Sequence, residues 1–188
     1  MKPIETYYNG YRFRSRLEAR WAVFFDALGV KYEYEPEGFK TRAGYYLPDF
    51  RVKCHGLRGD SKAKPFDLWI EVKGTMTESD KSKLRAFSSQ GECILIVHKI
   101  PNSGCATDSN DCEAYASMNG FRIYPFNYFL IDGDYFAAYP AATKDGRFYL
   151  FGDDSSYINK KDVERVEKAY DKARQARFEH GEKPNVAR

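Results

Sequence analysis

Residues 70–73 read Ile70-Glu71-Val72-Lys73 and close a predicted strand over 66–73. Side chains alternate along a strand, so the acid and the base share one face while the two aliphatic residues point to the other. The strand therefore holds a carboxylate and an ammonium group side by side. A salt-bridged exposed face is one explanation for such a pair, and a reactive centre is the other.

A second carboxylate stands upstream in Leu47-Pro48-Asp49-Phe50, within a predicted strand over 45–53. One explanation for an Asp residue directly after Pro is that both belong to a turn. If the two strands are neighbours, however, Asp49 and Glu71 converge on a hard cation, and Mg²⁺ is typically held by one or two carboxylates with water and phosphate oxygens. Such a metal polarises a phosphodiester and lowers the pKa of a bound water. Lys73 would orient that water, stabilise negative charge or, with a lowered pKa, act as a base.

Helix and strand signals surround both motifs. Asn9-Gly10 predicts a hairpin turn, and Ser15 as N-cap predicts a helix that stops at Gly29. The sequence then predicts strands over 30–35, 45–53 and 66–73, turn residues over 36–44, a basic loop over 54–65, a helix over 79–89 and a strand over 93–98. The strand, helix, strand order at the end of this series predicts a parallel crossover.

Pro48-Asp49 followed by Glu71-Val72-Lys73 resembles the PD-(D/E)XK pattern of restriction-endonuclease-like nucleases. The run from Tyr11 to Glu18 also looks like the first helix of several branches, in which a helix Glu faces the metal site. The resemblance covers about the first 100 residues. It implies an α/β fold with an αβββαβ core over about 11–100 and a mixed central sheet.

By this resemblance, Asp49 and Glu71 would be catalytic metal ligands, and the backbone carbonyl of Val72 would add another ligand. Lys73 would be the catalytic lysine. Glu18 would be a further carboxylate of the catalytic metal site, although a helix capping box explains it without catalysis. The implied cofactor is Mg²⁺, with Mn²⁺ able to substitute, and no organic cofactor is expected.

Basic side chains gather near both motifs, as contacts to a phosphate backbone require. Arg14 and Arg16 stand at the predicted helix start, and five more form a second group: Arg51, Lys53, Arg58, Lys62 and Lys64. Lys83 and Arg85 on the following helix are weaker candidates. We interpret the first two groups as candidate DNA contacts, although solvated basic faces explain them equally well.

The length of 188 residues suits one domain over 1–188 with additions to the core. Residues 101–120 predict an insertion loop, 121–181 predict aromatic-rich strands and a terminal helix, and 182–188 predict a tail. Trp21 and Trp69 lie in apolar periodic patterns and are expected in the core.

Composition restricts the class further. A hydrophobic fraction of 43% is that of a folded chain, and the formal net charge of +3 conceals local basic clusters. No apolar run approaches the roughly 20 residues of a membrane span, and the start lacks a signal-peptide pattern, so we expect a cytoplasmic protein. The four cysteines contain no C-x-x-C pair, which favours free thiols over zinc or disulfides.

Together with the resemblance, these features predict a metal-dependent deoxyribonuclease of the endonuclease kind and of phage, mobile-element or repair origin. One active site cuts one strand, so a homodimer would account for duplex cleavage. Two alternatives stay open, namely a DNA-structure or protein-binding module of the same fold without turnover, and a metal-dependent RNase.

Overall fold

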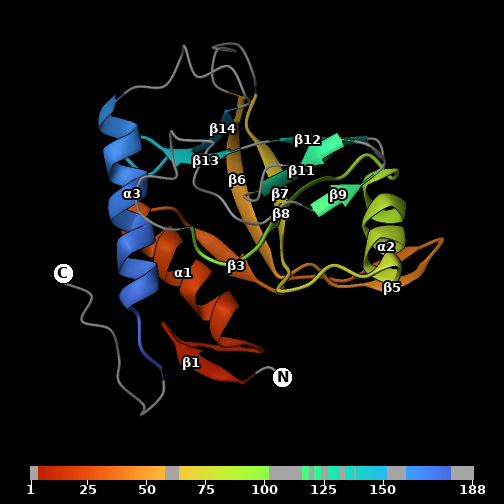
Figure 1. Cartoon of the computed structure of the whole chain (residues 1–188), viewed down its shortest axis with the longest axis horizontal. Helices are drawn as coiled ribbons and strands as arrows, with labels where there is room; N and C mark the ends of the chain where they lie inside the picture. The colour runs from red at the N-terminus through yellow and green to blue at the C-terminus, as the bar shows by residue number, and fades with distance from the viewer. Residues whose placement is uncertain are drawn as a thin grey trace.

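A computed structural model of the chain describes residues 4–57, 64–101, 116–118, 121–123, 127–131, 134–137, 139–151 and 160–178. Within this part the fold is mixed α/β, and three helices pack against a curled, mixed central sheet (Figure 1). The helices are α1 (Arg16–Leu28), α2 (Glu78–Ser88) and α3 (Lys160–Gln175).

In the described part of the chain, eight strands form the central sheet. They are β3 (Tyr32–Tyr34), β6 (Phe50–Leu57), β7 (Phe66–Val72), β8 (Cys93–Val97), β11 (Asn127–Ile131), β12 (Asp134–Ala137), β13 (Tyr139–Ala142) and β14 (Phe148–Phe151). Their order in space is β12-β11-β8-β7-β6-β14-β13, and β3 pairs with the first half of β6. β6 runs antiparallel to β7, whereas β7 and β8 are parallel and joined through α2, which confirms the predicted crossover.

The C-terminal strands extend both edges of this sheet. β11 pairs with β8 and carries β12 on its outer side, while β14 pairs in parallel with β6 and carries β13. α3 then packs against α1 and β13 (Figure 1). The predicted aromatic-rich strands thus extend this sheet, except for β10 (Phe121–Ile123), which lies in a separate two-stranded sheet.

β7 separates two hydrophobic cores. Leu68, Ile70 and Val72 belong to the core that α1 and α3 cover, whereas Trp69 packs with Phe87 in the core under α2. Both tryptophans of the chain are buried, as predicted. The strict alternation along β7 leaves the acid of the Glu-x-Lys motif on the α2 side of the sheet.

The first helix has the predicted ends. The Ser15 hydroxyl accepts the backbone N–H of Glu18 at 3.2 Å, and Gly29 closes the helix with a left-handed φ of 71°. The predicted hairpin of β1 (Thr6–Tyr8) and β2 (Tyr11–Phe13) is also present, and Asn9-Gly10 turns it with φ values of 47° and 84°.

Three of the predicted ranges are wrong. The strand expected over 45–53 is divided into β5 (Gly44–Tyr46) and β6, because Pro48 has no N–H for the ladder. Residues 36–44, expected as a turn, supply β4 (Phe39–Thr41), which forms a hairpin with β5. β6 in turn continues to residue 57, into the expected loop over 54–65.

The predicted insertion loop over 101–120 contains a short strand, β9 (Ala116–Met118), which pairs with β10 (Phe121–Ile123). Residues 102–115 and the predicted tail over 182–188 lie outside the described part of the chain. Cys54 and Cys93 are free thiols. Among the described residues, no helix is both long enough and apolar enough to cross a membrane.

Candidate active site

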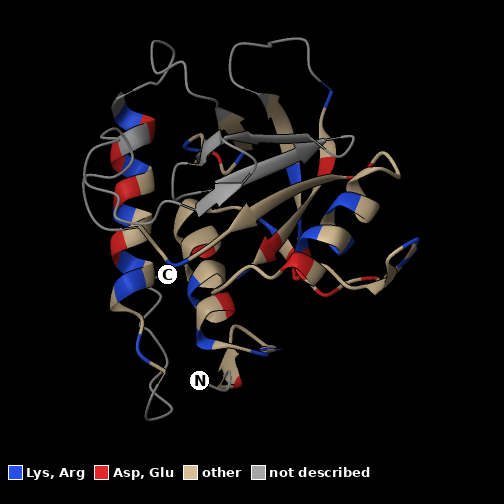
Figure 2. Ribbon diagram, turned by 45° about the vertical axis from the view of Figure 1, so that its right-hand side comes forward, with Lys and Arg blue, Asp and Glu red and all other residues tan. Residues whose placement is uncertain are grey.

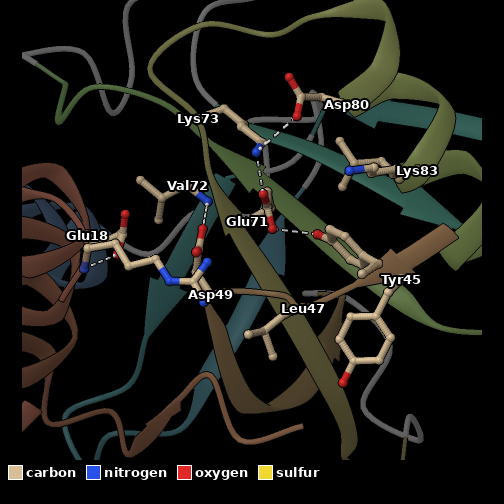
Figure 3. Close-up of a pocket in the computed structure, with 12 residues that line it drawn as sticks. Glu18, Tyr45, Leu47, Asp49, Glu71, Val72, Lys73, Asp80 and Lys83 are labelled. Carbon is tan, nitrogen blue, oxygen red and sulfur yellow. Dashed lines mark hydrogen bonds and ion pairs between the residues drawn. The ribbon is translucent and has the colours of Figure 1, made fainter. Parts of the chain in front are cut away.

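A cavity of about 540 Å³ opens between the start of α1, the start of β6, the end of β7, and α2 (Figure 3). Its walls are formed by Arg14, Glu18, Tyr45, Tyr46, Leu47, Asp49, Glu71, Val72, Lys73, Asp80, Lys83 and Leu84. All four side chains predicted as catalytic from sequence therefore line one cavity, together with the residue predicted to offer its backbone carbonyl.

Asp49 is placed by the pairing of β6 with β7. It precedes the first residue of β6, and its Oδ2 accepts the backbone N–H of Val72 at 2.7 Å. Its own backbone carbonyl accepts the N–H of Glu35 at 2.8 Å. The Asp49 carboxylate is thus tied to the end of β7 beside Glu71, as the predicted neighbouring strands require.

Glu71 and Lys73 lie side by side, as the strand alternation predicts. Lys73 Nζ is 2.7 Å from Glu71 Oε1 and 3.2 Å from Asp80 Oδ1 (Figure 3). The hydroxyl of Tyr46 donates to Glu71 Oε2 at 2.5 Å. Glu71 is only 4% exposed, so both of its oxygens are held by neighbouring side chains in a buried setting.

Glu18 has a second network at the start of α1. Its carboxylate accepts the hydroxyl of Ser15 at 2.6 Å, the hydroxyl of Tyr34 at 2.6 Å and the backbone N–H of Arg14 at 3.0 Å. The side chain is 7% exposed and lines the cavity. Glu18 therefore stabilises the helix start and at the same time faces Asp49 across the cavity (Figure 3).

The carboxylates of the cavity repel one another. Burial, with further contributions from Glu71 and Glu18, holds the pKa of Asp49 well above its usual range. Burial also raises the pKa of Glu71, although Lys73 and Tyr46 oppose this effect. The site thus concentrates negative charge that a bound cation would neutralise.

The pKa of Lys73 argues against one of the roles that the sequence suggests for it, that of a base with a lowered pKa. Burial lowers the pKa of Lys73, but the carboxylates of Glu71 and Asp80 outweigh burial and the pKa is raised above its usual value. A raised pKa keeps the side chain protonated at neutral pH. The geometry therefore favours a lysine that orients water or stabilises charge over a lysine that acts as a base.

Carboxylate oxygens are the donors that this cavity would offer to a divalent metal. Among the described residues, no three side chains of His, Cys, Asp or Glu form a ready metal cluster. Mg²⁺ requires no such cluster, because one or two carboxylates suffice when water and phosphate oxygens complete its shell. Asp49 and Glu71 meet this requirement, since each oxygen of a carboxylate has two lone pairs and one remains beside an existing hydrogen bond.

The predicted DNA-contact residues divide into two groups. Among the described residues, Arg14 and the weaker candidate Lys83 line the cavity. Four others do not line it: Arg16, Arg51, Lys53 and Lys64. Arg51 is ion-paired with Glu33 and Glu37, and Lys53 with Asp67 at 2.7 Å. Arg58 and Lys62 lie outside the described residues.

Sequence reasoning missed three residues of the site, namely Tyr46, Asp80 and Tyr34. The signal for Asp80 was present, since Thr77 and Asp80 have the spacing of a capping box, which the structure contains. The two tyrosines have no local signal, because their hydroxyls bond to carboxylates that are distant in sequence.

No family model, no curated protein and no solved structure matches this chain. The inference of function therefore depends on the arrangement of the side chains in the cavity.

Proposed function

We propose that the protein is a magnesium-dependent nuclease of the PD-(D/E)XK type that hydrolyses phosphodiester bonds in DNA. The observation that carries the proposal is the convergence of Glu18, Asp49, Glu71 and Lys73, from three separate parts of the sequence, on one cavity. If Glu71 and Lys73 were only a chance pair along a strand, Glu18 and Asp49 would not be expected to line the same cavity.

The order of elements supports the same proposal. α1, β3, β6, β7, α2 and β8 follow one another as helix, three strands, helix and strand, with only the small β4–β5 hairpin added. This order is the αβββαβ order that the resemblance implies. We therefore propose a restriction-endonuclease-like core within the mixed α/β fold.

Asp49 and Glu71 would hold Mg²⁺ or Mn²⁺, with the Val72 carbonyl and Glu18 as further donors. The bound metal supplies Lewis-acid polarisation of the phosphate and a lowered pKa of water. Lys73, held between Glu71 and Asp80, keeps a positive charge where negative charge develops on the phosphate.

In the reaction, the oxygen of water bonds to phosphorus and the bond from phosphorus to the 3′ oxygen breaks. The proton from water passes to solvent, and the leaving oxygen takes up a proton from solvent. The products are a 5′ phosphate and a 3′ hydroxyl, as the resemblance implies. Lys83 and Arg14, which is ion-paired with Glu35 at 2.7 Å, line the same cavity and would contact the adjacent phosphates.

The test is cleavage of supercoiled plasmid, linear duplex, single-stranded DNA and RNA with Mg²⁺ or Mn²⁺ and with EDTA. We expect metal-dependent DNA cleavage by the wild type and none by Asp49→Ala or Lys73→Ala. Lys172→Ala is the matched control, because this exposed lysine lies on α3 away from the cavity. Salt-dependent DNA binding without any cleavage would instead indicate a binding module, and cleavage of RNA alone would indicate an RNase.

A further inference from the structure

An exposed aromatic ring stands at the edge of the cavity. Tyr45, on β5, is 69% exposed although it lines the cavity wall. Among the described residues, the other large hydrophobic side chains with high exposure are Ile4 and Tyr7, and neither lines the cavity. Internal packing therefore does not account for a tyrosine ring at this position.

One edge of the ring also lies close to the backbone of Gly38. A Cβ atom added to Gly38 would lie 2.0 Å from the hydroxyl oxygen of Tyr45, so the hydroxyl end of the ring occupies the space of the missing side chain. Tyr45 also follows the regular register of the hairpin, where it pairs with Lys40. A ring whose freedom is already restricted on one side loses less conformational freedom when it binds a ligand.

The charge around Tyr45 suits a polyanion. The hairpin segment 38–46 contains two bases, Lys40 and Arg42, and no acid. Both bases are exposed, and Figure 2 shows basic residues on this hairpin, at the right of the molecule beside α2. Lys83 adds a positive charge from α2 on the same cavity.

Tyr45 and its neighbour Tyr46 face opposite ways along β5. Tyr46 is buried and bonded to Glu71. Tyr45 is exposed, and its ring points away from Glu71 in Figure 3. The exposed ring is therefore one residue from a side chain that contacts the proposed metal site. Both tyrosines line the cavity that holds the carboxylates, so a nucleotide next to the scissile phosphate would approach this ring.

We propose that Tyr45 is a stacking platform for an unpaired nucleobase next to the cleaved phosphate, so that the preferred substrate is DNA with a single-stranded segment at the cut. The substrate class rests on the proposed nuclease function. Exposed aromatic rings among basic residues bind single strands because every base presents a flat face, whereas the bases of a duplex already stack on one another.

Binding without metal tests this inference separately from catalysis. Fluorescence anisotropy in EDTA would compare a labelled single-stranded oligonucleotide with a duplex of the same sequence. We expect Tyr45→Ala to weaken single-strand binding about tenfold, the size of one base stack, and to change duplex binding less than about twofold. Tyr45→Phe keeps the ring and is expected to bind as the wild type does.

Tyr7→Ala is the matched control, because Tyr7 is 73% exposed on β1 and does not line the cavity. Thermal unfolding of each variant would verify that it is folded. Equal single-strand binding by Tyr45→Ala and the wild type would overturn the inference, as would an equal loss for both substrates. If the selective loss occurs but no DNA is ever cleaved, the stacking site stands and the nuclease proposal fails.

Discussion

The hydroxyl of Tyr46 donates a 2.5 Å hydrogen bond to Oε2 of Glu71, and both side chains are buried. Lys73 contacts the other oxygen of the same carboxylate at 2.7 Å. Two neighbours therefore fix the orientation of the carboxylate, and the proposed metal ligand is positioned before substrate binds.

Tyr46→Phe removes this hydrogen bond and keeps the ring. We expect the nicking rate to fall about tenfold, the effect typical of a lost partner of a metal ligand. The free energy of unfolding should decrease by about 1 kcal/mol. Tyr45→Phe is the control, because its hydroxyl lies on an exposed residue. An unchanged nicking rate in Tyr46→Phe would show that Glu71 does not need this positioning.

Asp80 joins α2 to the site, because it pairs with Lys73 at 3.2 Å and accepts the backbone N–H of Thr77 at 3.0 Å. Asp80→Asn removes the charge that holds Lys73, and we expect a nicking rate about tenfold lower. Thr77→Ala removes the cap and the 2.6 Å hydrogen bond from the Thr77 hydroxyl to Asp80, but it leaves the charge of Asp80 beside Lys73, so it should cost about 1 kcal/mol of stability with little effect on the rate. Equal rates for the two variants at equal stability would exclude a positioning role for Asp80.

Gly146 lies against the end of α1. It has a φ of 79°, and a Cβ atom there would lie 2.3 Å from the backbone oxygen of Gly29. Gly146→Ala should therefore lower the free energy of unfolding by about 2–4 kcal/mol, from backbone strain and overpacking. Gly10→Ala has a similar φ of 84° with open space around it, and about 1 kcal/mol is expected. Urea unfolding measures both, and equal losses would contradict this packing of the two glycines.

The burial of His98 predicts how the stability of the protein depends on pH. Burial lowers the pKa of His98 below its usual value, and its contact with the Lys73 carbonyl at 2.7 Å opposes this effect. The folded state therefore favours neutral His98, while the unfolded chain takes up a proton near its ordinary pKa of about 6.5. Since the unfolded state then binds more protons, this contribution to stability is complete above about pH 6.5 and declines as the pH falls toward the folded pKa.

The measurement is urea unfolding at pH 7.5 and 5.5, at about one unit either side of the ordinary histidine pKa. The wild type should lose more stability between these two values than His98→Gln does. Trp21 provides a local reference, because its ring N–H donates to the His98 carbonyl at 2.7 Å and its fluorescence reports unfolding nearby. The same pH dependence in both proteins would contradict the prediction for His98.

Much of the fold was predictable where local chemistry decides it. Ser15 and Gly29 delimit α1 because capping acts within one helical turn, and alternation along β7 places Glu71 and Lys73 on one face. The β4–β5 hairpin was missed because Tyr45 and Tyr46 have strand propensity and run directly toward β6 in sequence. Only the absent N–H of Pro48 indicates the break between them.

The rest of the site depends on tertiary geometry. The bonds from Tyr46 to Glu71 and from Tyr34 to Glu18 join residues 25 and 16 positions apart, and no local pattern specifies them. Arg51 shows the opposite case, since it stands among basic residues in sequence but forms ion pairs with acids of the same surface. A charge count along the chain does not show such pairing.

The most direct test of the proposed nuclease site is the initial rate of plasmid nicking in Mg²⁺ by Glu71→Gln and by Asp67→Asn. Both residues lie on β7 with the same parity, but Asp67 is exposed and pairs with Lys53 outside the cavity. We expect Glu71→Gln to lose at least about a hundredfold in rate with DNA binding retained, and Asp67→Asn to cut within about twofold of the wild type. Glu71→Gln cutting as fast as the wild type would contradict the proposed metal site.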